Sequence, residues 1–304
     1  MSFEFERKES VSRGVRRIAE EQVGLLLADL HGKKRIGRDA VVHEARKRLN
    51  RLRALLRLVH GSMDRKTRRH LNDVLRDLGR TFSDARDAKV LIDAFDRVLK
   101  RGTDKSLPVR LRPIRGRLIA NHRKALQAQM ELGWDDAVKS LRTAKRKISS
   151  VSVDGEGFAA LHEGLKRIFR AGRKAFARSR DDRDAGIRHE WRKRVKDLRY
   201  HAELLKPVCP DVLKQFEGRA HALANCLGEE HDLYVLREHL LHEISRLAVP
   251  ADLESLFESI DDRHRELRNE AIRLGERVYS EKPGDFIERM QNAWNAWSNG
   301  VADT

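Results

Sequence analysis

Apolar residues recur every three or four positions along nearly the whole chain, which is the spacing of one face of an amphipathic α-helix. Only six prolines interrupt the 304 residues, and they are grouped in a few places. Because proline ends or kinks a helix, long stretches remain free for helices. No hairpin signal and no strict alternation of apolar and polar residues is present. The pattern therefore predicts an all-α fold.

The periodicity also predicts where the helices lie. Residues 64–100 carry the helical period without a break, so they form one long helix or two in tandem. Asp39 is the expected N-cap of the second helix. The remaining helices are expected at 11–30, 39–59, 107–131, 134–148, 158–179, 186–206, 211–246, 251–278 and 284–297.

A Ser/Gly-rich stretch at 149–157 (SSVSVDGEG) breaks this pattern, and the helical spacing starts again after it. We take it as a boundary between an N-terminal helical unit, 1–150, and a C-terminal one, 155–304. Each unit has four or five helices joined by short turns, which favours a helical bundle in each.

The two units resemble each other in sequence. Segment 43–48 (HEARKR) recurs 146 residues later as segment 189–194 (HEWRKR). At an offset of 145, Arg86-Asp87 corresponds to His231-Asp232. Offsets that drift by a residue or more are expected when loops differ in length between copies. The sequence therefore predicts an internal duplication.

The chain is strongly basic, with 64 Lys and Arg against 47 Asp and Glu, a net charge of +17 and a pI near 10.2. Such a charge predicts a polyanionic partner, and nucleic acid, an acidic membrane and polyphosphate all qualify at this level. Residues 38–60 hold seven Lys and Arg but only two acids. This imbalance is unusual for a solvated helix, which gains from pairing opposite charges four residues apart.

Helical geometry places these basic residues on one face of each duplicated helix. Guanidinium groups bind phosphate oxygens bidentately, and lysine adds a compact charge. A row of such groups suits an extended chain of phosphates. The cationic face of the first copy contains His43, Arg46, Lys47, Asn50, Arg53 and Arg57, and that of the second contains His189, Arg192, Lys193, Lys196, Arg199 and Tyr200.

The pattern His-x-x-Arg-Lys-x-x-x-x-Leu-Arg, which begins at His43 and again at His189, resembles the signature of the CHAD domain, the conserved histidine α-helical domain. Segment 227–236 (LGEEHDLYVL) is similar to the second motif of this family, and segment 83–91 is its counterpart in the first half. The resemblance covers residues 5 to about 280.

This resemblance implies two pseudo-symmetric four-helix bundles around a basic central groove or pore that binds inorganic polyphosphate. Some members are fused to triphosphate-processing domains, and others associate with polyphosphate granules. By position, the implied ligands are His43, Arg46, Lys47, Arg53, His189, Arg192, Lys193, Lys196 and Arg199, joined from the second motif helices by Arg76, Arg80, Arg86, His221 and His231. Asn50 corresponds to Lys196 and Asn225 to Arg80, so the halves should not bind identically.

No phosphate-binding glycine loop, paired-carboxylate magnesium site or nucleophile motif is present in the sequence. The histidines lack the spacing of a metal site. Cys209 and Cys226 are interpreted as reduced thiols. We therefore expect a binding protein and not an enzyme, with no cofactor and no metal.

The sequence shows no apolar signal core and no apolar run of membrane-spanning length, so no membrane partner is expected. The expected location is the cytoplasm, with association with polyphosphate granules and their proteins as a further expectation. Binding should weaken with salt, and it should strengthen from pH 8 to 6 if His43, His189 and His231 gain charge.

Two other functions remain open from the sequence. One is sequence-independent binding of nucleic acid, although aromatic stacking residues are few. The other is an accessory subunit of a polyphosphate-metabolising enzyme. Oligomeric state and preferred chain length are not fixed by the sequence.

Overall fold

The computed structural model describes residues 3–32, 37–102, 104–131, 134–181, 184–244 and 250–300. Within these ranges every regular element is helical, and the β-type pairing is limited to an isolated antiparallel bridge between Met63 and Val153. The predicted all-α fold is confirmed.

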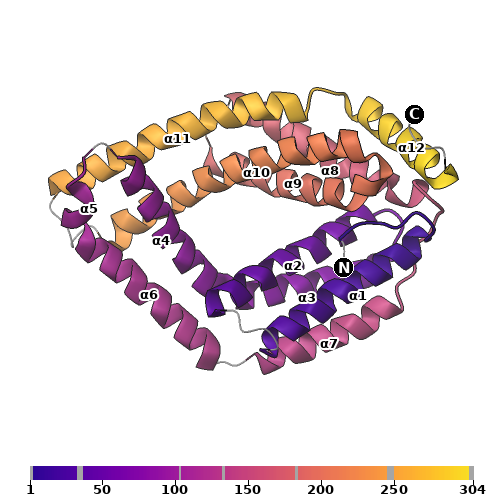
Figure 1. Cartoon of the computed structure of the whole chain (residues 1–304), viewed down its shortest axis with the longest axis horizontal. Coiled ribbons are helices and arrows are strands. Elements are labelled where there is room, and N and C mark those ends of the chain that lie inside the picture. The colour runs from indigo at the N-terminus through magenta and orange to yellow at the C-terminus, as the bar shows by residue number, and fades with distance from the viewer. Residues whose placement is uncertain are drawn as a thin grey trace.

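The first half of the chain contains seven of the described helices (Figure 1). They are α1 (Val11–Leu30), α2 (Arg38–Leu58), α3 (Arg65–Thr81), α4 (Ser83–Arg101), the single turn α5 (Leu107–Arg110), α6 (Arg112–Glu131) and α7 (Asp135–Ser149).

The second half has longer helices. They are α8 (Ala159–Asp181), α9 (Ala185–Leu205), α10 (Pro210–His239), α11 (Pro250–Val278) and α12 (Pro283–Asn299). A 3-10 turn, η1 (Lys206–Val208), follows α9, and a π-helical segment, η2 (Leu240–Ile244), follows α10. Most boundaries agree with the predicted ranges to within two residues.

The structure decides the open cases of the helix prediction. Residues 64–100 form two helices, because the chain bends at the buried Phe82 between α3 and α4. The prediction that Asp39 caps α2 is wrong. The N-cap is Gly37, which makes no side-chain hydrogen bond, and Asp39 lies in the first turn. There Asp39 Oδ1 lies 3.0 Å from His122 Nε2.

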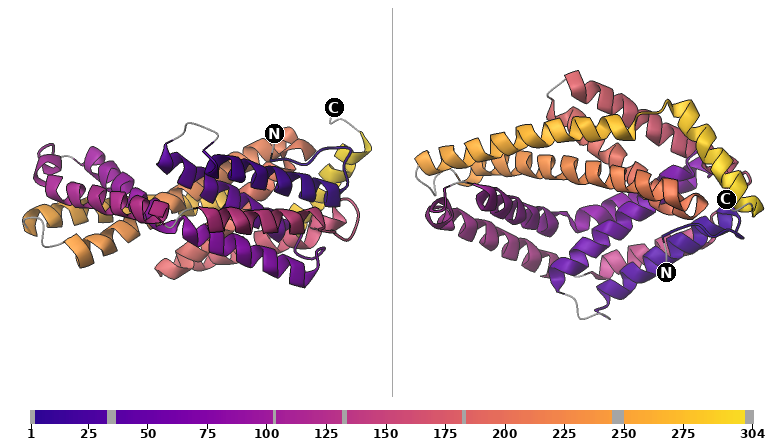
Figure 2. Two further views of the ribbon diagram at one scale, coloured as in Figure 1. Left: turned by 90° about the horizontal axis from the view of Figure 1, so that it is seen from below. Right: turned by 45° about the horizontal axis from the view of Figure 1, so that its top comes forward.

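The helices of the two halves pack in the same order. In the first half α1 packs against α2 and α7, and in the second half α8 packs against α9 and α12. Likewise α4 packs against α6, and α10 against α11. Figures 1 and 2 show α10 and α11 running side by side along one edge of the molecule, across from α1 and α2. The predicted pair of separate four-helix bundles stays a prediction.

Contacts of α2 and α4 join the two halves. Helix α2 packs against α8 and α9, and α4 packs against α10 and α11, and the buried apolar residues of both halves form one continuous core. The closest approach is at Gly164 of α8, where a Cβ atom would lie 1.8 Å from the Leu58 carbonyl oxygen of α2. Close by, the fully buried His201 of α9 donates its Nε2–H to the Ala54 carbonyl oxygen of α2 over 2.9 Å. These contacts bring together α2 and α9, the helices that carry the two copies of the basic motif.

Candidate functional site

Charged side chains from α2, α4, α9 and α10 meet where the two halves join. Arg192 Nη2 lies 3.9 Å from Asp232 Oδ1, and Arg46 Nη1 donates to Ser83 Oγ over 2.8 Å. The residues that act on one another electrostatically here are called the junction cluster, and they are Arg46, Arg86, Asp87, Arg192, Lys196 and Asp232.

The junction cluster contains more cations than carboxylates, and the pKa values of its members are shifted accordingly. Burial, with Arg192 nearby, lowers the pKa of Lys196 to about 7, although Asp232 acts in the opposite direction. The pKa of Arg192 is likewise lowered, by burial first and then by Arg46 and Arg86. Burial raises the pKa of both Asp87 and Asp232 in spite of the arginines beside them. Four partly buried cations thus lie beside two carboxylates, of which Asp87 is exposed. An anionic ligand would be stabilised most where these cations are least accessible to water.

A cationic groove extends from the cluster along α2 and α3. It encloses a cavity of about 170 Å³. Arg53 donates to Asn72 Oδ1 over 3.3 Å, and burial together with Arg57 lowers its pKa. The groove is lined by Arg46, Leu49, Asn50, Arg53, Leu75, Arg76, Gly79, Arg80 and Ser83, so it brings together four of the predicted ligands.

Several cations at the rim are paired with acids on their own helix. Arg76 Nη1 lies 2.9 Å from Asp73 Oδ1, and Arg80 Nη1 lies 3.3 Å from Asp77 Oδ1. Exposed pairs of this kind are weak and can be exchanged for a stronger anion. Lys47 pairs with Glu44 on α2 in the same way, at 3.7 Å, and His43 is exposed one turn before it.

Cations on the corresponding face of the second half are also paired with acids. Arg199 Nε lies 3.7 Å from Glu217 Oε1, and Lys193 Nζ lies 2.6 Å from Glu190 Oε2. His221 Nε2 is 3.0 Å from Asn225 Nδ2. The predicted difference between the halves agrees with this arrangement, since the α2–α3 groove has arginines where α10 has His221 and Asn225.

Two predicted ligands lie elsewhere. Tyr200 is only 8% exposed and packs edge-on against Phe3, with ring centroids 6.3 Å apart, so it is a core residue. Arg57 Nη1 lies 2.9 Å from Oδ1 of the buried Asp197, an ion pair that joins α2 to α9. Asp197 was not singled out from the sequence. It could have been, because it is an acid that directly follows Lys196 on a helix rich in Lys and Arg.

Two of the predicted histidines, His189 and His231, lie close together in the structure. The rings of His189 and His231 lie 4.8 Å apart, centroid to centroid. Burial, followed by the charge of Arg192, lowers the pKa of His231 to about 4, and burial also lowers the pKa of His189. In the unliganded protein both shifts oppose the expected gain of charge between pH 8 and 6. Lys196 is the group of the junction cluster whose pKa falls in that range.

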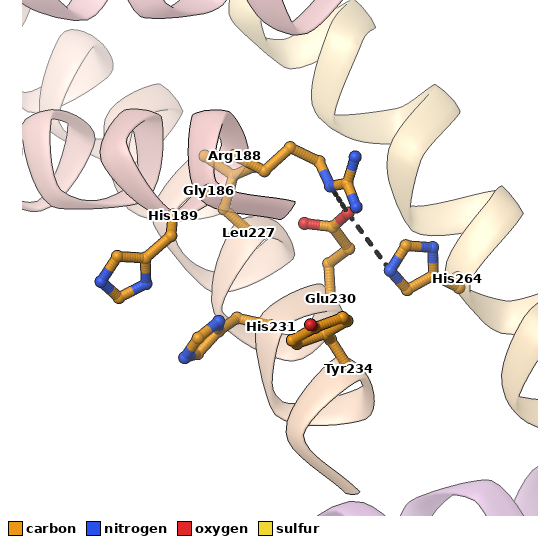
Figure 3. Close-up of a pocket in the computed structure, with 8 residues that line it drawn as sticks. All are labelled: Gly186, Arg188, His189, Leu227, Glu230, His231, Tyr234 and His264. Carbon is orange, nitrogen blue, oxygen red and sulfur yellow. Dashed lines mark ion pairs between the residues drawn. The ribbon is translucent and has the colours of Figure 1, made fainter. Parts of the chain in front are cut away.

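Beside the histidine pair lies a pocket that sequence reasoning missed, with a volume of about 330 Å³ (Figure 3). Helices α9, α10 and α11 form it. Glu230, which is 3% exposed, is paired with Arg188 and lies 3.4 Å from His264 Nε2. The lining residues are Gly186, Arg188, His189, Leu227, Glu230, His231, Tyr234 and His264.

Two negative findings apply to the described parts of the chain. There, no group of three or more His, Cys, Asp or Glu side chains is arranged to hold a metal ion. Over the same residues, none of the helices has the length and apolar character needed to cross a membrane. Neither Cys209 nor Cys226 forms a disulfide bond.

The fold and the site together define a class of all-helical proteins with basic residues gathered where the N-terminal and C-terminal parts of the chain meet. A family model described as the CHAD domain matches residues 17–241, well over half of the sequence. The chain belongs to the CHAD domain family, as the motifs predicted.

Known relatives and solved structures agree with this assignment. Two curated proteins of Mycobacterium tuberculosis, one from strain CDC 1551 / Oshkosh and one from strain ATCC 25618 / H37Rv and both described as uncharacterized, are 29% identical over 247 residues. The match covers 75% of this chain but 45% of those proteins, so the chain spans less than half of their length.

Two solved structures share the fold. The CHAD domain from the plant Ricinus communis aligns with a TM-score of 0.59 at 19% identity, over 97% of this chain and 95% of that one. PptA from Streptomyces chartreusis aligns with a TM-score of 0.65 at 13% identity, over 90% of this chain and 100% of that one. At these identities the likeness is one of fold.

Proposed function

We propose that the protein binds inorganic polyphosphate through the junction cluster and the α2–α3 groove. The observation that carries this proposal is the convergence of Arg46, Arg192 and Lys196 from both halves on one partly buried place. Burying like charges together is unfavourable in the free protein, and an anion bound between them removes the repulsion. Membership of the CHAD family supports a role associated with polyphosphate in general terms.

A chain of phosphates fits this surface better than a single phosphate ion. Arg46 belongs to both the cluster and the groove, and Arg53 lies two turns further along α2, about 10 Å away at 1.5 Å per residue. Arg76 and Arg80 line the other side of the groove. The cations thus form a continuous path that an extended polyanion can follow.

We further propose binding without turnover. Asp87 and Asp232 are the acids of the cluster, and both lie among arginines that they partly neutralise. Phosphoryl transfer usually relies on a metal bridging phosphate oxygens, and carboxylates engaged by arginine are poorly placed to hold one. Release of orthophosphate from polyphosphate by the pure protein with Mg²⁺ or Mn²⁺ would contradict this part of the proposal.

The remaining expectations belong to the same proposal. Helices α2 and α9 both have 21 residues, and both enter the core beside the first helix of their half, which supports an internal duplication into two pseudo-symmetric bundles, 1–150 and 155–304, around a basic groove or pore. Cytoplasmic location and association with polyphosphate granules rest on the family resemblance.

The direct test is equilibrium binding of long-chain polyphosphate to the purified protein at physiological ionic strength, with duplex DNA as competitor. We expect DNA to displace polyphosphate only at a large excess of phosphate groups, because a groove with a cavity of about 170 Å³ is small for a duplex. Displacement at equal phosphate concentration would instead favour a general polyanion-binding or nucleic-acid-binding protein.

Polyphosphate affinity should fall steeply with salt. Each phosphate contact to a cation releases condensed counterions, so the logarithm of the binding constant should decrease linearly with the logarithm of the salt concentration. If four to six phosphates are engaged, we expect a loss of at least tenfold between about 50 and 200 mM salt. An affinity that does not change over this range would exclude the cationic path as the binding surface.

Replacing Lys196 by methionine should raise the stability of the protein at low pH and weaken its binding of polyphosphate. The pKa of Lys196 is lowered from 10.5 to about 7, so between these values the unfolded chain binds more protons than the folded one. The free energy of unfolding of the wild type should therefore rise with pH from 7 toward 10. Below pH 7 the whole cost of burying the charge is present, and Lys196→Met should then unfold at a higher denaturant concentration than the wild type.

The same variant should bind polyphosphate more weakly, about tenfold at pH 6.5, because a charged contact is lost. Wild-type affinity should also decline as the pH rises above 7, and that decline should be smaller in Lys196→Met. Denaturant titrations and binding at pH 6.5 and 8.5 measure both effects. A variant that is less stable at pH 6.5, or that binds as well as the wild type, would contradict the assignment.

A further inference from the structure

The pocket of Figure 3 differs in character from the cationic groove. Its walls are aromatic and aliphatic: His189 and His231 form one side, Tyr234 and Leu227 contribute from α10, and His264 faces them from α11. The charged groups within it, Arg188 and Glu230, neutralise each other. With a volume of about 330 Å³ it has the size and lining of a small-molecule site rather than of a phosphate site.

The first half of the chain shows that this polarity is not required by the fold. At the offsets of the sequence repeat, Arg188 corresponds to Val42 and Glu230 to Ala85. Val42 and Ala85 are each 2% exposed and belong to the apolar interior. An apolar pair can thus fill this position, and buried ion pairs are often no more stabilising than apolar residues of similar size. The ion pair in the second half is therefore best explained by a role in binding a ligand.

The pocket opens beside the junction cluster. Arg192 and Lys196 are both close enough to His231 to lower its pKa. On α10, Leu227 lines the pocket, and at the next residue, Gly228, an added Cβ would lie 4.0 Å from Arg192 Nε. A molecule seated in the pocket can therefore extend directly toward the cluster cations.

We propose that the pocket receives the base of a nucleoside oligophosphate, whose phosphates bind Arg192 and Lys196. A planar heterocycle can stack on Tyr234 or the histidine rings, because base–aromatic stacking accepts any base. The buried carboxylate of Glu230 and the ring of His264 offer an acceptor and a donor to the polar edge of the base. This proposal rests on the proposed function, since it uses the cluster as the phosphate site.

The end of a polyphosphate chain fits the pocket less well. A terminal phosphate carries more charge than an internal one and would be placed next to the buried carboxylate of Glu230, which repels it. It would also leave the apolar wall around Leu227 without a partner. A base can contact the apolar wall with its ring face and the polar groups of the pocket with its edge.

The test compares ATP with inorganic tripolyphosphate by calorimetry, in the absence of divalent metal. Both probes carry three phosphates, and tripolyphosphate has the greater charge, so tighter binding of ATP must come from the nucleoside. We expect ATP to bind about 5- to 100-fold more tightly, the range of one stacked base. Tyr234 is 40% exposed, so Tyr234→Ala should fold and should reduce the ATP affinity to that of tripolyphosphate.

Three companions make the result decisive. Tyr234→Phe keeps the ring and should retain the preference for ATP, whereas Val212→Ala, which removes an exposed apolar side chain elsewhere on α10, should change neither affinity. Equal affinity of the wild type for the two probes, or equal weakening of both by Tyr234→Ala, would overturn the inference while leaving polyphosphate binding intact. If neither tripolyphosphate nor long-chain polyphosphate binds, the proposed function fails. Binding of ATP alone would then support the pocket as a nucleoside site but not the cluster as a polyphosphate site.

Discussion

Simultaneous neutralisation of the junction cluster is expected to lower the affinity for polyphosphate by about a hundredfold or more. The variant carries glutamine in place of Arg46, Arg86, Arg192 and Lys196. These side chains reach one place from α2, α4 and α9, so each can contact the same stretch of ligand. A charge-assisted contact of this kind contributes about 1 kcal/mol or more, and every 1.4 kcal/mol changes the dissociation constant tenfold. Equilibrium binding of long-chain polyphosphate measures the loss.

A matched control separates this effect from the loss of net charge. It removes four cations that pair with nearby acids outside the cluster, namely the exposed Arg115, Lys139 and Arg265 and the partly buried Arg289. This control should lose less than about fivefold, since its charges act only through the long-range field. Equal losses in the two variants would mean that the charge serves polyanions generally.

The cluster variant removes the cluster cations beside Asp87 and Asp232, although Asp232 keeps its ion pair with Arg97. Its folding must therefore be checked by circular dichroism and thermal melting. A milder variant keeps the test informative if it unfolds. Replacing Arg53, Arg76 and Arg80 by glutamine changes the wall of the α2–α3 groove, where the side chains are partly or largely exposed. It should lose about tenfold in affinity with little change in stability. Unchanged binding would exclude the groove from the path of the ligand.

The helical fold was predictable because its signal is local. The periodicity placed the helix from Val11 to Leu30 with both ends correct, and the other long helices to within a few residues. It could not decide whether 64–100 is one helix or two, since that depends on where the buried Phe82 finds its packing partners. Asp39 misled for a similar reason. Its sequence position suits an N-cap, but its carboxylate lies beside His122, 83 residues away.

The sequence predicted only those parts of the site that lie on one face of a single helix. The spacing on α2 correctly placed Arg46 and Arg53 together in a groove. It also included Arg57, which instead bonds to Asp197 of the other half, because helical geometry does not reveal which face a second helix covers. The depressed pKa of Lys196 is likewise a property of four helices meeting. Neither the Arg57–Asp197 ion pair nor the shifted pKa of Lys196 follows from the spacing of residues along one helix.

The pocket of the second half could have been found by comparing the two repeats, although the spacing within one motif does not indicate it. Arg188 and Glu230 lie at positions whose counterparts, Val42 and Ala85, continue the apolar pattern of their helices. A residue-by-residue comparison of the repeats, including the apolar positions, would have marked the pair as an exception. His264 could not have been assigned with them, because α11 comes beside α10 only in the folded chain.

Replacing Gly164 by alanine should be the most destabilising single change among the described glycines. The added Cβ would lie 1.8 Å from the Leu58 carbonyl oxygen and 2.6 Å from that of Arg57, so the backbones of α8 and α2 must move apart. Contacts with backbone cannot be relieved by a side-chain rotation. We expect a loss of about 3 kcal/mol or more in the free energy of unfolding, in spite of the higher helix propensity of alanine. Chemical denaturation measures it.

The matched control is Gly218→Ala on α10, where an added Cβ meets nothing within 4 Å. That change should stabilise the protein by up to about 1 kcal/mol, because only the propensity term remains. If Gly164→Ala were as harmless as Gly218→Ala, the close packing of α8 on α2 would be wrong. The same packing positions α2 against α9, and with it Arg46 against Arg192. Gly164→Ala protein that remains folded should therefore bind polyphosphate more weakly than the wild type, although residue 164 is remote from every cation of the cluster.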